Sequence, residues 1–116
     1  MMTYEKPQYP PESGKNSSNK LDVLSDFNKA IALKPDFDEA KANKVKTLHF
    51  LWRFEEAMDV WDSMHEENEK EKVAKYAHQS CLILAYEAYL REEYVDNMEW
   101  LNKSAAIHEK HYNKGD

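Results

Sequence analysis

Hydrophobic residues along most of this chain recur every three or four positions, the spacing that places them on one face of an α-helix. Five stretches carry the pattern, at about residues 21–33, 38–51, 54–66, 72–91 and 94–108. Neither glycine nor proline occurs between Asp36 and Lys114, so short polar corners rather than glycine-containing turns join these stretches. The sequence therefore predicts an all-α domain of about five antiparallel helices.

The residues expected to face the core follow from the same spacing. In the first three stretches they are Leu24, Phe27, Ala30, Ile31, Ala40, Lys41, Lys44, Val45, Leu48, Phe54, Ala57, Met58, Trp61 and Met64. In the fourth stretch they are Val73, Tyr76, Ala77, Cys81, Leu84, Ala85 and Ala88. In the last stretch Tyr94, Met98, Leu101 and Ala105 are expected to face inward, with Trp100 and Ile107 off this stripe.

The ends of the chain differ in composition from the helical part, residues 21–109. Residues 1–20 hold three of the four prolines and the polar run KNSSNK. Such a composition cannot bury enough apolar area to offset the entropy of ordering, so we expect a disordered tail. Its YPP segment is alternatively an extended ligand for another domain. Residues 110–116 are expected to fray.

Two features define the helix boundaries. Pro35 ends the first helix, because proline disfavours the helical conformation of the residue before it, and Asp36 or Asp38 is expected to cap the second. The charged stretch 65–72 fits either a loop or a solvated helical turn. Its mixture of glutamate and lysine favours the helix, since opposite charges three or four residues apart support one.

A spacing of 34 residues relates positions in the first and third stretches: Val23 to Ala57, Phe27 to Trp61 and Ala30 to Met64. With the segments FNKAIALKPDFDEA and RFEEAMDVWDSM, the chain resembles the tetratricopeptide repeat, a helix–turn–helix unit of 34 residues. Residues 21–33 resemble the second helix of one repeat, and residues 38–66 resemble a complete repeat. Residues 72–108 resemble another, in a shifted frame: Phe54 to Tyr94 and Trp61 to Leu101 are each 40 apart.

The match to the repeat pattern has departures. Lys41 and Lys44 replace the usual bulky residues of the second helix, while Val45 and Asn97 stand at glycine and small-residue positions. These departures leave the close crossing of the two helices in the middle repeat open. The alternative interpretation is a plain helical bundle whose 34-residue spacing is accidental.

The resemblance implies a superhelix whose concave face binds a peptide or helix of another protein. The expected function is therefore a non-enzymatic protein–protein interaction module, an adaptor or scaffold. Carried over by position, the implied binding face consists of Asn43, Lys46, His49, Phe50, Gln79, Ile83, Tyr86 and Tyr89. Ile83, Tyr86 and Tyr89 fit a position in the core equally well.

Some members of the family hold a C-terminal carboxylate with a set of lysine, asparagine and arginine side chains. Asn43 fits one such position, but the matching basic residues on the fourth helix are absent, which disfavours this subtype. The alternative function is a structural or assembly subunit. It would self-associate as a homo-oligomer, or stack on a larger helical array, through the open ends of the repeats.

Composition excludes several classes of function. The net charge of −6 argues against a nucleic-acid partner, which needs clustered lysine and arginine. No apolar run approaches the length that spans a membrane. The single Cys81 cannot form an internal disulfide, and no secretory signal is readable at the start, so we expect a cytoplasmic protein.

No group of residues predicts catalysis, a cofactor or a metal site. His108 and His111 are three apart, a minimal metal pair, but no cysteine or carboxylate cluster joins them. His49 and His78 lie on different helices. Cys81 stands in an apolar run, where a buried inert thiol is favoured over a nucleophile. We therefore expect no enzymatic activity.

Overall fold

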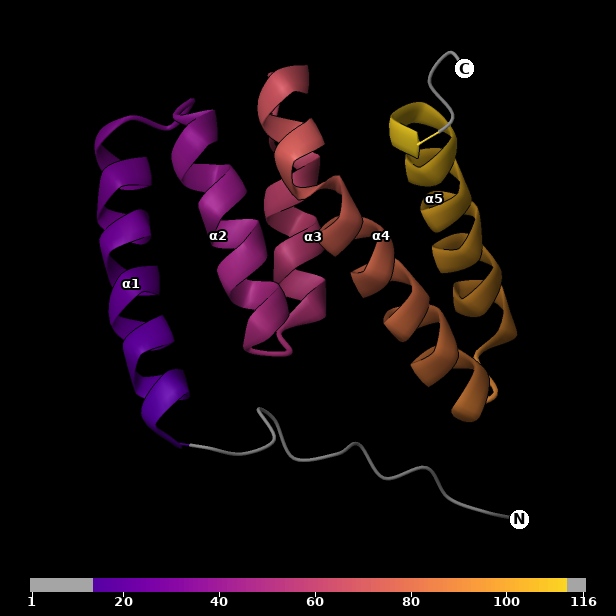
Figure 1. Cartoon of the computed structure of the whole chain (residues 1–116). Helices are drawn as coiled ribbons and strands as arrows, with labels where there is room; N and C mark the ends of the chain where they lie inside the picture. Colours follow the sequence, from indigo (N-terminus) through magenta and orange to yellow (C-terminus); the bar gives the residue numbers. More distant parts are fainter. Residues whose placement is uncertain (1–13, 113–116) are drawn as a thin grey trace.

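The described part of the chain is entirely helical. The computed structural model describes residues 14–112, with side chains from residue 19 onward, and shows no strand within that range. The helices are α1 (Gly14–Leu33), α2 (Asp38–Phe50), α3 (Phe54–Asp62), α4 (Glu67–Leu90) and α5 (Tyr94–Tyr112) (Figure 1). The predicted all-α class is confirmed. The predicted N-terminal tail up to residue 13 and the C-terminal residues 113–116 lie outside the described residues.

Both outer helices are longer than predicted. α1 begins at Gly14 rather than at about residue 21, so the helix includes the polar run before Leu21. α5 continues to Tyr112, so residues 110–112 are helical instead of frayed. Lys110 Nζ lies 3.0 Å from Glu67 Oε2 at the start of α4, which ties the last turn of α5 to its neighbour.

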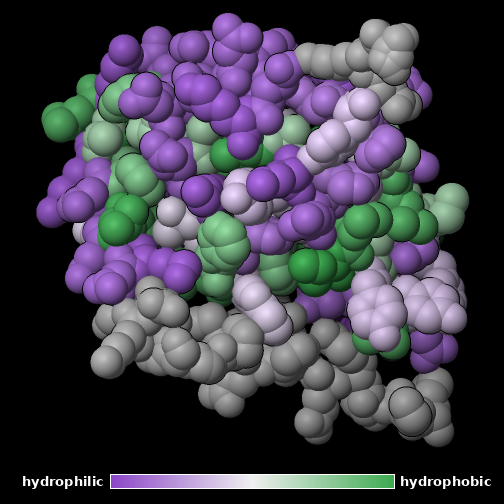
Figure 2. Space-filling model, in the orientation of Figure 1, coloured by the Kyte–Doolittle hydropathy of each residue, from purple (hydrophilic) through white to green (hydrophobic). Residues whose placement is uncertain are grey.

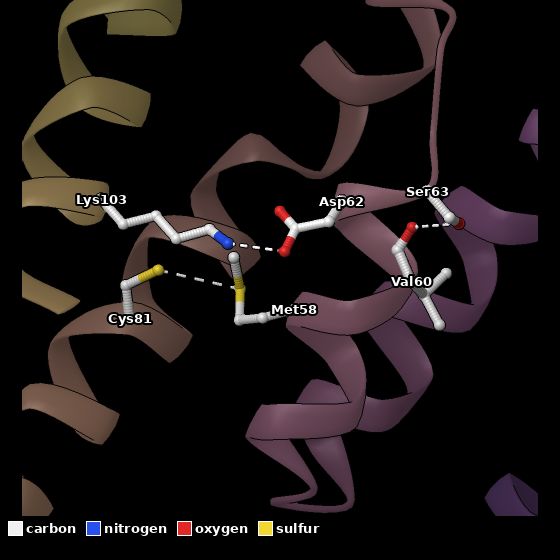
Figure 3. A network of polar contacts seen from close by, with 6 residues as sticks. All are labelled: Met58, Val60, Asp62, Ser63, Cys81 and Lys103. Carbon is white, nitrogen blue, oxygen red and sulfur yellow. Dashed lines mark hydrogen bonds and ion pairs between the residues drawn. The ribbon is translucent and has the colours of Figure 1, made fainter. Parts of the chain in front are cut away.

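The charged stretch between α3 and α4 is mostly helix. α4 begins at Glu67, and in its first turns Glu69 pairs with Lys72 at 3.1 Å, the arrangement three residues apart that supports a helix. α3 ends at Asp62, earlier than the predicted residue 66. There the hydroxyl group of Ser63 donates a hydrogen bond of 2.7 Å to the carbonyl oxygen of Val60 (Figure 3).

Each helix packs on the next in chain order, and α2 also packs on α4. α4 has 24 residues and α2 has 13, so α4 continues well past the end of α2. Figure 1 shows the C-terminal half of α4 leaning away from α2 and α3, so that this half and the start of α5 form a hairpin beyond the other helices. α1 lies at the opposite end and, among the five described helices, contacts α2 alone.

The core lies where α2, α3 and α4 meet. Its most buried members include Val45, Leu48, Ala57, Ala77 and Cys81, each 0% exposed. Trp61, the central residue of the sequence pattern, is 5% exposed, which confirms its predicted burial. The thiol of Cys81 points to the thioether sulfur of Met58 at 3.8 Å (Figure 3), so small and flexible side chains fill the space between α3 and α4.

The predicted inward face of α5 is wrong. Tyr94, Met98, Leu101 and Ala105 are exposed, whereas Ile107 is buried and Trp100 packs against the core. The physical reason is that polar residues occupy the contact with α4. The amide of Asn97 donates to the carbonyl oxygen of Ala85 at 2.7 Å, and the hydroxyl of Ser104 lies 2.8 Å from Nδ1 of His78. With these partners, polar groups pack against α4 without an unpaired donor.

The predicted capping of α2 is also wrong. The residue before the helix is Phe37, and no side chain caps the first turn. Asp38 is 2% exposed, and its Oδ2 accepts hydrogen bonds of 2.6 Å from the backbone N–H groups of both His65 and Glu66. Lys41 Nζ donates to the carbonyl oxygen of Ser63 at 3.2 Å. Two polar residues of α2 therefore hold the corner from which α4 starts.

The corners of the two helical hairpins have the same geometry. Trp52 and Glu92 adopt left-handed conformations, with φ of 60° and 63°. After each, the next amide donates back into the preceding helix, from Arg53 to Leu48 at 2.9 Å and from Glu93 to Ala88 at 2.8 Å. This is the Schellman arrangement that usually ends a helix at glycine. The α2–α3 hairpin thus recurs in α4–α5.

Candidate functional site

A cleft separates the N-terminal halves of α2 and α4, which run side by side in the same direction. Two contacts show that the helices run in parallel, because their residue numbers increase together along both. Lys46 Nζ lies 5.9 Å from the ring centre of Tyr76, and His49 Nδ1 lies 2.8 Å from the hydroxyl of Ser80. The cleft has a volume of about 400 Å³. Its walls are formed by Glu39, Ala42, Asn43, Lys46, Glu69, Lys72, Val73, Lys75 and Tyr76.

Positive charge predominates on these walls. Lys46, Lys72 and Lys75 line the cleft, against the two carboxylates of Glu39 and Glu69. One of these carboxylates is paired with one of the lysines, because Glu69 Oε2 lies 3.1 Å from Lys72 Nζ. Lys46 and Lys75 instead lie over the ring of Tyr76, at 5.9 and 5.2 Å from its centre. The cleft therefore presents ammonium groups around an aromatic ring.

An aromatic cluster continues the cleft toward the end of α2. The ring of His49 lies 5.4 Å from those of Phe54 and Tyr76, and the ring of Phe50 lies 5.4 Å from that of Tyr76. Phe50 is 44% exposed, and Lys20 of α1 lies 5.9 Å from its centre. Burial lowers the pKa of His49 below its ordinary value, which favours the neutral imidazole. The cluster therefore offers apolar and aromatic surface rather than charge.

The binding face implied by the sequence divides into two parts. Asn43 and Lys46 line the cleft, and His49 and Phe50 belong to the aromatic cluster. Tyr86 and Tyr89 lie farther along α4, roughly 9 and 14 Å beyond Ser80 at the rise of an α-helix. Tyr89 contacts Tyr94 of α5 at 6.1 Å between ring centres and lies far from the cleft.

The remaining members of that face have clear positions. Tyr86 and Tyr89 are 62% and 56% exposed, so they belong to the surface and not to the core. Ile83 is half-buried and packs against the core. Gln79 is exposed one turn before Ile83, outside the cleft.

Of the residues that line the cleft, the sequence placed only Asn43 and Lys46 on a binding face, and it missed the others, among them Lys72, Lys75 and Tyr76. Lys72 and Lys75 stand three residues apart, and Lys72 belongs to the charged stretch that fitted either a loop or a solvated turn. Tyr76 was expected in the core, yet it is half-buried and lines the cleft. The sequence feature that could have identified Lys72 and Lys75 is their spacing of three residues. This spacing places both ammonium groups near one face of α4, which begins at Glu67.

The histidines pair with serines and aromatic rings. His49 and His78 are in separate contacts, the first with Ser80 and the second with Ser104 at 2.8 Å. His108 lies against His78, at 5.4 Å, whereas His111 lies against Trp61. Among residues 14–112, no group of three or more histidine, cysteine or carboxylate side chains is arranged to hold a metal ion.

Cys81 is surrounded by apolar side chains. Burial raises the pKa of its thiol to about 12, with a smaller opposing effect of Lys103. Lys103 itself pairs with Asp62 at 2.7 Å beside the two sulfur atoms (Figure 3). A thiol with this pKa carries almost no thiolate at neutral pH and is a poor nucleophile.

A second cleft, of about 330 Å³, lies between α3 and α5 and has the opposite charge. It is lined by Glu55, Asp59, Asp96, Glu99 and Trp100. The surface formed by α2 and α4 is therefore rich in lysine, and that formed by α3 and α5 is rich in carboxylate. The two clefts therefore differ in the sign of the charge they present.

Comparison of the chain with protein-family models, with curated proteins and with solved structures found no match. In the described part of the chain, no helix has both the length and the hydrophobicity needed to cross a bilayer.

Proposed function

We propose that this protein is a non-enzymatic interaction module, a tetratricopeptide-like adaptor or scaffold. On this proposal it binds an acidic segment of a partner protein in the cleft between α2 and α4. The observation that carries the proposal is that three lysines and Asn43 line the cleft together with Tyr76, with Lys46 and Lys75 over its ring. A cytoplasmic location belongs to the proposal, because the single cysteine has no partner for a disulfide within the chain.

The repeated hairpin supports the repeat-protein part of the proposal. The left-handed residues Trp52 and Glu92 are 40 positions apart and end corresponding helices, α2 and α4. The spacing of 40 rather than 34 residues between the two units is accommodated by the extra turns of α4. Asp38 accepts a hydrogen bond from the corner that precedes α4. In a stack of such hairpins, the first helix of each unit lines one common surface.

The chemistry of the cleft favours carboxylate groups on the ligand. Lys46 and Lys75 offer ammonium groups that have no carboxylate partner among the ion pairs of the described residues. The Asn43 side chain is exposed beside them and can donate or accept a hydrogen bond. A cleft of this size holds only a few residues, so affinity should be on the order of micromolar.

The test is fluorescence polarisation with a labelled hexaglutamate peptide, compared with a hexaserine peptide of the same length. The wild-type chain should bind the acidic peptide more tightly, and added salt should weaken binding because the ammonium groups are exposed. Lys46→Glu should reduce affinity about tenfold, the effect of roughly 1.4 kcal/mol. Lys29→Glu makes the same charge change on the exposed face of α1 and should leave affinity unchanged.

Two results would reject the cleft as the site. Equal losses in Lys46→Glu and Lys29→Glu would mean that only net charge matters. Equal affinity for hexaglutamate and hexaserine would show that the cleft does not select acidic ligands. Circular dichroism of both variants checks that helix content is retained.

A second function is favoured by a different observation. Apolar side chains of α5, among them Val95 at 73% and Met98 at 56% exposed, face outward at the end of the helical array, and Leu33 of α1 is 88% exposed at the other end. This favours a structural or assembly subunit that associates through its open ends. Terminal units of helical arrays that remain monomeric usually carry a polar outer face.

A further inference from the structure

An apolar surface extends across the C-terminal half of α4 and the adjoining part of α5. Its members are each 40–62% exposed: Leu82, Tyr86, Tyr89, Tyr94, Met98 and Leu101. We refer to these six residues as the α4–α5 face. Figure 2 shows hydrophobic and weakly polar side chains gathered over this half of α4, at the lower right of the view.

Ring contacts show that the stripes of the two helices lie on one side. At the tip of the hairpin, Tyr89 of α4 contacts Tyr94 of α5 at 6.1 Å. At the other end, His78 of α4 contacts Tyr112 of α5 at 5.9 Å. Tyr89 is eleven positions beyond His78, three turns along α4, and therefore on the same side of that helix.

The exposed area is comparable to that of a specific interface. An aromatic side chain buries 150–250 Å² when it is fully covered, so the three tyrosines alone expose roughly 300–400 Å². Leu82, Met98 and Leu101 add to this area. A stable dimer buries about 800 Å² on each partner, and apolar patches above a few hundred Å² mark interaction sites.

The spacing of the exposed stripe of α4 is unchanged on reversal, with apolar residues at its centre and opposite charges at its two ends. Its positions are Lys75, Gln79, Leu82, Tyr86, Tyr89 and, just after the helix, Glu93. The five positions within the helix are spaced by four, three, four and three residues, the spacing of a helix that packs along a second helix. Glu93 follows four residues later, beyond the end of the helix at Leu90. Reversal about residue 84 places Leu82 opposite Tyr86, Gln79 opposite Tyr89, and Lys75 opposite Glu93.

We propose that a second copy of this chain docks on the α4–α5 face, with the two α4 helices antiparallel about a two-fold axis near Leu84. A two-fold axis perpendicular to a helix always makes the two copies of that helix antiparallel, and each contact then occurs twice. Leu82 and Tyr86 form the apolar centre. Met98 and Leu101 of each copy flank it.

Charge complementarity selects a second copy in this register. Lys75 lies nine residues before the axis, about 14 Å along α4, and Glu93 follows the C-terminal end of α4 at Leu90, so two Lys75–Glu93 pairs would bracket the apolar centre. Within one copy, the Glu93 carboxylate pairs with the exposed Arg91 at 3.1 Å, and the Glu93 side chain is still 47% exposed. These short-range pairs counter the repulsion between two chains of net charge −6, which salt screens beyond about 10 Å.

This inference rests on the second proposed function, assembly, and does not depend on a ligand in the cleft. The two sites share only Lys75, which lines the end of the cleft and the end of the stripe. The test therefore measures self-association without any peptide.

The experiment is sedimentation equilibrium of the full chain over a hundredfold range of concentration. The wild type should show a monomer–dimer equilibrium. Tyr86→Glu places a carboxylate at the apolar centre and should lower the association constant at least tenfold without loss of helicity, because Tyr86 is 62% exposed in one copy. Ser25→Glu is the control: it adds the same carboxylate at an exposed position of α1 that belongs to neither proposed surface, and it should leave association unchanged.

A charge exchange tests the register. Lys75→Glu and Glu93→Lys should each weaken the dimer severalfold, and the double variant should recover most of the loss, because the reversed pairs reform across the axis. A wild-type chain that stays monomeric throughout would overturn both the dimer and the assembly function. A dimer that is insensitive to Tyr86→Glu, or whose charge variants show no recovery when combined, would overturn this interface while leaving self-association in place.

Discussion

Removing the carboxylate of Asp38 should be one of the most damaging polar substitutions in the chain. Its Oδ2 accepts two hydrogen bonds of 2.6 Å, from the N–H groups of His65 and Glu66, and these lie just before α4. Asp38→Ala leaves both amides without that acceptor. The corner that positions α4 against α2 then loses its main polar contact.

The expected magnitude follows from the environment of the carboxylate. A hydrogen bond to a charged group contributes about 1.5–3 kcal/mol, so two contribute roughly 3–6 kcal/mol. Against this, Asp38 Oδ1 is buried without a hydrogen-bond partner, which costs about 1–3 kcal/mol and is relieved in the variant. Asp38→Ala should therefore destabilise the fold by about 2–4 kcal/mol. Asp38→Asn keeps an oxygen acceptor and should cost about half as much, since it loses only the charge.

The pH dependence gives a separate signature. Burial acts to raise the pKa of Asp38, but the amides of Glu66 and His65 and the charge of Lys41 outweigh it, so the folded pKa lies below the ordinary value of 3.8. A lowered carboxyl pKa contributes stability above the unfolded value. That contribution disappears as the pH falls through the folded value. The difference in the free energy of unfolding between the wild type and Asp38→Asn should therefore become smaller below about pH 4.

Urea unfolding followed by circular dichroism, at pH 7 and at steps down to pH 3, measures all three effects. With a slope of about 1–3 kcal/mol per molar, Asp38→Ala should lower the midpoint by roughly 1–2 M. Asp36→Ala removes a neighbouring exposed carboxylate and is the control, with an expected change below about 0.5 kcal/mol. Equal effects of the two alanine variants, or a gap that stays constant with pH, would refute the reasoning.

Three further predictions concern single residues. Trp61→Ala should destabilise the fold by about 3–5 kcal/mol, because the ring is 5% exposed in the core; an unchanged melting temperature would contradict this. Glu92→Gly should raise stability in urea by about 1 kcal/mol, since the φ of 63° is strained for a residue with a Cβ atom, and a loss would mean that the glutamate side chain stabilises the corner. Cys81, with its pKa raised to about 12 by burial, should react with a thiol reagent at pH 8 only at the rate of unfolding; immediate reaction in native buffer would show an accessible thiol.

Periodicity predicted the helices and the inward faces of α2, α3 and α4, because their buried residues are mostly apolar and the spacing of such residues is visible in the sequence. It failed for α5. There the positions against α4 are taken by Asn97 and Ser104, whose hydrogen-bond partners come from another helix and cannot be read from local spacing. Where polar residues form a helix contact, an apolar stripe can face the solvent, and Met98 and Leu101 do so.

The candidate cleft was predicted only in part for a related reason. Asn43 and Lys46 were expected on a binding face, but Lys72 and Lys75 face them only because α4 begins at Glu67 and runs parallel to α2. That alignment depends on the contact of Asp38 with residues 65 and 66, which joins parts of the chain 27 and 28 positions apart. A sequence pattern with a period of three or four residues carries no information about such a contact.

The position of α1 has a consequence for the dynamics of the molecule. Because it packs on α2 alone, α1 can separate and return without disturbing α3, α4 or α5. Opening of this kind costs less free energy than global unfolding, so its amide hydrogens should exchange with solvent well before those of α4. Separation also takes Leu24 and Lys20 away from α2, which exposes the flank of α2 beside Phe50. Opening of α1 would therefore uncover the stretch of α2 next to the aromatic cluster, which α1 covers in the closed structure.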